Sequence, residues 1–136
     1  MHRLTERPQR NVFGFVDPDR VECSIYSYQQ NHRMLEIELH DPEPQTTVYL
    51  QFVMVHYFTG PTVWVGADFT LMPRLVSMEM AQTLEVFGNQ NLQALSRDEL
   101  EEHLQLCKVY DVCPANLPLE KITICAANVH VHIATT

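Results

Sequence analysis

Apolar and polar residues alternate through much of this chain, which is the period-two pattern of half-buried β-strands. The clearest case is residues 35–40, with the sequence LEIELH, where every second position is apolar. Residues 21–25 alternate in the same way, and residues 122–133 carry apolar side chains opposite two histidines. The pattern therefore predicts that most ordered elements of the chain are strands.

Other segments fit the same pattern less regularly. Residues 11–16 predict a short strand, and residues 109–112 predict another. The segments 46–58 and 63–72 are separated by a Gly-Pro turn, so we expect them to pair as a long hairpin. The second half of 46–58 is apolar at successive positions, which indicates a strand buried on both faces or bulged. Residues 75–87 fit both helix and strand, and alternation favours a strand.

One helix is predicted near 97–107. Ser96 and Glu99 have the spacing of a capping box, and Leu100, Leu104 and Cys107 follow at helical spacing. The fold class expected is mainly β, an antiparallel β-sandwich or open barrel with this one amphipathic helix. The alternative is an α+β two-layer arrangement.

The 136 residues suit a single domain. Residues 1–11 are polar without periodicity and predict a mobile arm. Residues 12–136 are expected to form one globular β-rich domain.

The net charge of the chain excludes some classes of binding partner. The chain has 9 Lys and Arg against 17 Asp and Glu, a net charge of −8. Nucleic acids and anionic membranes attract proteins through Lys and Arg, so neither is expected as a partner. No apolar run approaches the 18 residues that a membrane-spanning helix needs.

The negative charge is concentrated in one segment. Residues 34–73 contain no Lys or Arg but five acidic residues, and Glu36 and Glu38 share one face of a predicted strand. Four of these acids form the predicted partner-binding set: Glu36, Glu38, Asp41 and Glu43. An acidic strand face attracts and orients a basic protein.

No nucleophile elbow, phosphate-binding glycine loop or zinc-protease motif occurs, so no catalytic residue is assigned. We therefore expect a non-catalytic interaction module, comparable to small acidic inhibitor or immunity proteins that neutralise a basic target. A homodimer is the default expectation for a small β domain with sheet edges to cover.

Four cysteines are too few and too irregularly spaced for a disulfide scaffold. They predict free thiols and a cytoplasmic location.

A second hypothesis is a small metal-binding β-barrel protein. His130 and His132 are separated by one residue on a predicted strand, so both imidazoles point to one face. A divalent transition metal would need a third ligand, and His40, His56 and Asp68 are the candidates. Without that ligand we expect no cofactor.

Three further features have alternative interpretations. Phe52, Met54, Met78 and Met80 suggest a carrier of a small apolar ligand, although core packing explains the same residues. The turns at 17–19 and 41–43 each carry two acids, which indicates either calcium binding or ordinary turn chemistry. Asp68 lies near Trp64 and is a perturbed base, a side chain that faces water, or the partner of a backbone donor at a bulge.

Overall fold

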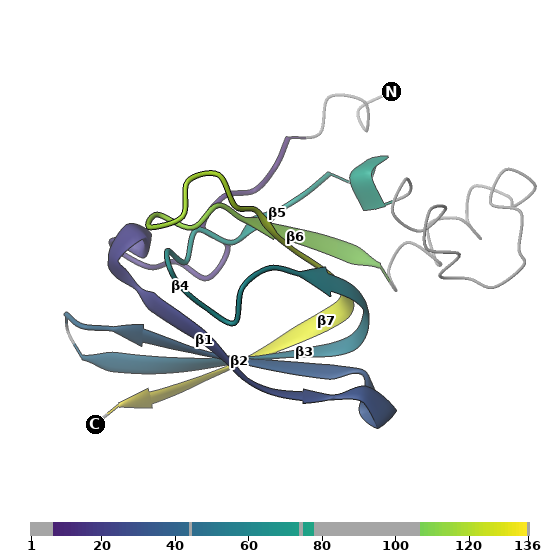
Figure 1. The fold of residues 1–136 in the computed structure, drawn as a ribbon, viewed down its shortest axis with the longest axis horizontal. Coiled ribbons are helices and arrows are strands. Elements are labelled where there is room, and N and C mark those ends of the chain that lie inside the picture. Colours follow the sequence, from purple (N-terminus) through teal and green to yellow (C-terminus); the bar gives the residue numbers. More distant parts are fainter. Residues whose placement is uncertain (1–6, 44, 74, 78–106, 136) are drawn as a thin grey trace, which may run out of the picture.

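Seven antiparallel strands form one sheet in the order β4-β1-β2-β3-β7-β6-β5, and the sheet curls into a half-barrel (Figure 1). The structure is a computed structural model that describes residues 7–43, 45–73, 75–77 and 107–135, and all counts refer to these residues. The strands are β1 (Glu22–Gln29), β2 (Met34–Asp41), β3 (Thr46–Thr59), β4 (Val63–Val65), β5 (Thr70–Leu71), β6 (Lys108–Val112) and β7 (Ile122–Thr135). Two short 3-10 turns, η2 (Pro18–Arg20) and η3 (Gln30–His32), precede β1 and β2. The mainly β, antiparallel class is confirmed, and the half-barrel corresponds to the predicted open barrel.

The core lies on the concave side of the sheet, hereafter the inner face. Apolar residues at alternate positions of β2 and β3 point into it and are at most 6 % exposed: Leu35, Ile37, Leu39, Val48, Leu50 and Phe52. The aromatic rings of Trp64 and Phe69 fill the space beneath them. Burial of each large side chain contributes about 1.5–3 kcal/mol, so this alternation fixes which face of each strand points inward.

Two bulges change the side-chain alternation. In β1 the register shifts between Ile25 and Ser27, which leaves Tyr26 as an extra residue opposite Glu36. In β3 the register shifts between Val55 and Tyr57, and Met54 adopts a positive φ of 52°. The bulge expected in the second half of 46–58 is therefore present.

The predicted hairpin between 46–58 and 63–72 is wrong. Both edges of β3 are occupied, one by β2 and the other by β7. The segment after the turn divides at Gly66, so that β4 pairs with β1 and β5 pairs with β6. The physical reason is length, because the 14-residue β7 offers β3 a far longer ladder than a three-residue strand does.

The strand predicted over 11–16 is also wrong. Asn11 and Gly14 have positive φ values of 49° and 71°, which a regular strand does not adopt. The Asn11 side-chain amide donates to the Phe15 carbonyl at 2.8 Å and accepts from the Phe15 amide at 3.1 Å, so the segment is a turn. The Phe13 ring in this turn packs edge-on against the Phe69 ring, and the two centroids are 5.2 Å apart.

The remaining predictions are tested only in part. Residues 75–77 are helical rather than extended, because Val76 and Ser77 donate their amides back to the Pro73 carbonyl. The rest of 75–87, and the predicted helix up to residue 106, lie outside the described residues. Of the arm predicted over 1–11, Gln9 exchanges backbone hydrogen bonds with Leu71, and Arg10 bonds to Asp68.

Candidate functional site

The convex side of the sheet, hereafter the outer face, carries acids on β2 and histidines on β7, with β3 between them. Two rows of directly opposed residues cross these three strands: Glu36–Gln51–His130 and Glu38–Tyr49–His132. Strand alternation places these residues outward because their neighbours on β2 and β3 are core. The sheet thus joins parts of the chain almost a hundred residues apart into one polar surface.

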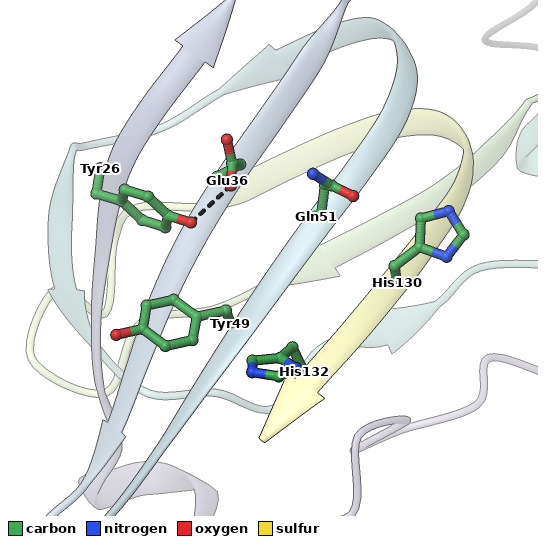
Figure 2. Close-up of a pocket in the computed structure, with 6 residues that line it drawn as sticks. All are labelled: Tyr26, Glu36, Tyr49, Gln51, His130 and His132. Atoms are coloured by element: carbon green, nitrogen blue, oxygen red, sulfur yellow. Dashed lines mark hydrogen bonds between the residues drawn. The ribbon is translucent and has the colours of Figure 1, made fainter. Parts of the chain in front are cut away.

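Six side chains line a depression of about 300 Å³ on this face, drawn in Figure 2: Tyr26, Glu36, Tyr49, Gln51, His130 and His132. The Tyr49 ring lies between the rings of Tyr26 and His132, with centroid separations of 5.7 Å and 6.4 Å. Aromatic neighbours at these separations limit each other's rotation, so the surface of the depression is largely pre-formed.

Tyr26 and Glu36 are joined at one end of the depression. The phenol donates to Glu36 Oε2 over 2.6 Å. This hydrogen bond, together with desolvation and the carboxylate charge, raises the pKa of Tyr26 to about 12. The carboxylate oxygen that Tyr26 does not use remains a place for a donor from a bound partner.

Arginines neutralise three other acids of the 34–73 segment: Asp41, Glu43 and Asp68. Arg20 Nε lies 3.5 Å from Asp41 Oδ1, and Arg20 Nη1 lies 3.3 Å from Glu43 Oε2. Arg20 also lies 3.8 Å from Asp17, so its guanidinium bridges the two acidic turns that suggested a calcium site. Asp68 accepts from the Arg10 Nε at 3.1 Å and from the Asn11 amide at 2.8 Å.

The predicted partner-binding residues therefore fall into two groups. Glu36 and Glu38 share the outer face, and neither forms an ion pair with another described residue. Asp41 points to the inner side, where it is 6 % exposed and accepts the Glu43 amide. The structure does not bring Asp41 and Glu43 to the outer face.

The two histidines share the outer face, as the strand pattern predicted, and both line the depression. Within the described ranges, no three His, Cys, Asp or Glu side chains lie close enough together to hold a metal ion. His40 lies two strands away, with Nδ1 3.4 Å from the Thr47 hydroxyl, and Asp68 is bound to Arg10. His56 lies in the β3 bulge, beyond the depression.

Of the residues that suggested an apolar-ligand site, the two that the structure describes do not line a common site. Phe52 is fully buried in the core, whereas Met54 is exposed at the β3 bulge. Met78 and Met80 lie outside the described residues. Trp64 is likewise structural, since its indole Nε1 donates to the Gly66 carbonyl at 2.8 Å.

Sequence reasoning missed Tyr26, Tyr49 and Gln51 as members of the site. A signal was available for all three, because Tyr49 and Gln51 alternate with the buried residues of β3 and must point outward. Tyr26 in the same way continues the outward alternation of Glu22 and Ser24 along β1.

No helix among the described residues is long and apolar enough to cross a membrane. Protein-family models, curated proteins and solved structures provide no match to this chain.

Proposed function

We propose that this protein is a non-catalytic interaction module that binds a basic segment of another protein on the outer face of its sheet. The observation that carries this proposal is the absence of Lys and Arg from the strands that carry the outer-face acids. Strands β1, β2, β3, β4 and β7 contain no Lys or Arg. Glu36 and Glu38, together with Glu22 on β1, give their outer surface a negative potential that attracts cationic side chains.

The depression suits an arginine side chain of such a partner. A guanidinium placed there meets the Glu36 carboxylate at one end, and its planar face can stack on the Tyr49 ring. Gln51 and the two histidines offer further acceptors beside it. This chemistry favours arginine over lysine, because lysine lacks a planar face.

An exposed tyrosine at the end of the depression supports protein binding rather than small-molecule catalysis. Tyr26 is 49 % exposed. Its ring is held by the neighbouring ring of Tyr49. Tyrosines held in this way lose little entropy on binding and often dominate interface energies.

The proposed biological setting is cytoplasmic inhibition of a basic target, of the kind that acidic inhibitor or immunity proteins perform. The four cysteines support a reducing compartment, since all are free thiols and three are buried as small apolar residues.

Peptide binding tests this proposal directly. We expect an arginine-rich peptide to bind, and an equally charged lysine peptide to bind more weakly. Glu38→Lys should reduce affinity for the arginine peptide about tenfold, because it places a cation on the docking surface. Glu120→Lys is the matched control, since Glu120 is exposed in a loop before β7 and changes net charge equally.

Backbone amide shifts measured by NMR during the titration locate the bound peptide. Shifts confined to the outer faces of β1, β2, β3 and β7 would support the proposal. Equal weakening by the Glu38 and Glu120 substitutions would contradict it, because binding would then depend on net charge alone.

A further inference from the structure

Strand β7 is longer than the strand that covers its outer edge. It pairs with β3 from Thr123 to Thr135, but β6 covers only the segment from Ile122 to Ala126. In the described part of the chain, residues 127–135 have a strand on one side only, and no backbone bond to another loop occupies the other side. Figure 1 shows this end of β7 at the margin of the sheet.

The open edge lacks charged residues and proline, which usually prevent edge pairing, although the Asn128 Oδ1 accepts from the Val129 amide at 2.8 Å and would have to release it on pairing. Residues 127–135 contain no charged residue and no proline. On their inner side, Val131 is 49 % exposed and Ile133 is 61 % exposed, although the β3 residues directly opposite them are buried. The apolar inner face therefore continues across β7 and ends uncovered at its edge.

The sequence of this edge is nearly symmetric. Residues 129–133 read Val-His-Val-His-Ile, so that the order of β-branched and imidazole side chains is the same in both directions from Val131. Val131 is also the midpoint of the open segment 127–135. When a strand pairs antiparallel with a copy of itself, a twofold axis passes through its centre and like residues face one another.

We propose that two copies of this chain associate edge to edge through β7, on a twofold axis at Val131. In this pairing Val131 faces Val131 of the second copy, and Val129 faces Ile133. The two sheets become one continuous sheet, and the uncovered inner residues of β7 gain apolar neighbours. The near-palindrome at 129–133 favours a second copy over an unrelated strand, because self-pairing places β-branched against β-branched side chains.

The same pairing places four imidazoles on the outer face, with His130 of each copy opposite His132 of the other. Directly opposed side chains on one sheet face have Cβ atoms about 4.5–5.5 Å apart. This geometry supplies the third and fourth nitrogen ligands that one chain does not offer, so the dimer has a donor set suited to zinc or nickel.

Charged substitutions at Val131 test the proposal, because Val131 would face Val131 of the second copy. In sedimentation velocity at about 100 µM, where concentration favours association, we expect the wild-type protein to be a dimer. Val131→Glu and Val131→Lys should each be monomeric, because each charge would face its own copy. An equimolar mixture of the two variants should again form a dimer. Val63→Glu is the matched control, since Val63 is an exposed valine on β4, at the opposite end of the sheet.

Two results would overturn the proposal. One is a wild-type protein that stays monomeric, and the other is a dimer that Val131→Glu leaves intact. Circular dichroism checks that each variant is folded. If both variants unfold, hydrogen exchange of the wild-type protein tests the dimer instead. The backbone amides of residues 127–135 should exchange more slowly as the protein concentration rises, whereas the exchange rates of the β4 amides should not change. Exchange independent of concentration at 127–135 contradicts the dimer.

Discussion

The phenol of Tyr26 donates a 2.6 Å hydrogen bond to Glu36, at a point where β1 has one residue more than β2. The regular register that precedes the bulge already points Tyr26 to the same face as Glu36, because Ile25 pairs with Ile37. The bulge changes the residues that follow, so that Tyr28 is opposite the buried Leu35 rather than on the outer face.

This bond gives a pH-dependent prediction. The pKa of Tyr26 is raised to about 12 from an ordinary value of 10, mainly by the hydrogen bond to Glu36. A raised pKa in the folded state means that the contribution to stability is complete below pH 10 and is lost as the pH rises towards 12. We expect Glu36→Gln to lower the Tyr26 pKa towards 10, measured by NMR titration of the ring carbon that bears the hydroxyl. An unchanged pKa in this variant would show that the carboxylate is not the cause.

The second prediction concerns Gly66, which ends β4. Its φ of +123° is accessible mainly to glycine, and a Cβ there would lie 2.8 Å from the Ala115 backbone nitrogen. Ala115 donates its amide to Val65, so the contact cannot relax freely. We expect Gly66→Ala to cost about 3 kcal/mol or more of unfolding free energy in urea. Gly14→Ala is the control, because it also has a positive φ but no atom within 4 Å of the added Cβ, and should cost about 1 kcal/mol.

The third prediction concerns thiol reactivity. Cys113 is exposed, whereas Cys23, Cys107 and Cys125 are buried. Burial raises the pKa of Cys23 to about 12, and a hydrogen bond with Cys107 raises that of Cys125. We expect one thiol to react rapidly with a disulfide reagent at pH 8 and the other three to react only after unfolding. Cys113→Ser should remove the fast reaction, and a second fast thiol in that variant would contradict the burial described here.

The fourth prediction links metal to the proposed dimer. Zinc added to protein without a polyhistidine tag should tighten association at least about tenfold, because only the dimer offers more than two imidazoles at one place. Substituting both His130 and His132 with alanine should abolish the zinc effect without preventing association. His40→Ala is the control, since His40 is on the outer face but two strands away. Zinc-dependent association that survives loss of both edge histidines would assign the metal elsewhere.

The sequence predicted where the strands lie along the chain better than it predicted which strands pair with one another. Residues 35–39 were assigned correctly because a single buried face requires strict alternation. The pairing of β4 with β1 could not be read from the chain, because a short segment after a turn resembles the second strand of a hairpin. Only competition for the edges of β3 excludes that arrangement, and such competition is a property of the whole sheet.

The candidate site was predicted in part for the same reason. Glu36 and Glu38, and His130 with His132, follow from alternation within one strand. Asp41 belongs to the predicted partner-binding set, but it has the same parity as Leu39 and points inward to Arg20 rather than sharing the outer face with Glu36 and Glu38. The placement of the acids and the histidines on one surface depends on β3 lying between β2 and β7, which no local pattern reveals.

The strands at the two ends of the sheet order are very short, three residues in β4 and two in β5. Neither offers a ladder on which another molecule could extend the sheet for any distance. Association through β7 uses the same surface on both molecules, so it leaves no complementary surface for a third. β4 covers β1 only from Glu22 to Ser24, but the uncovered end of β1, residues 26–29, is short. We therefore expect association to end at two chains and not to form a fibre.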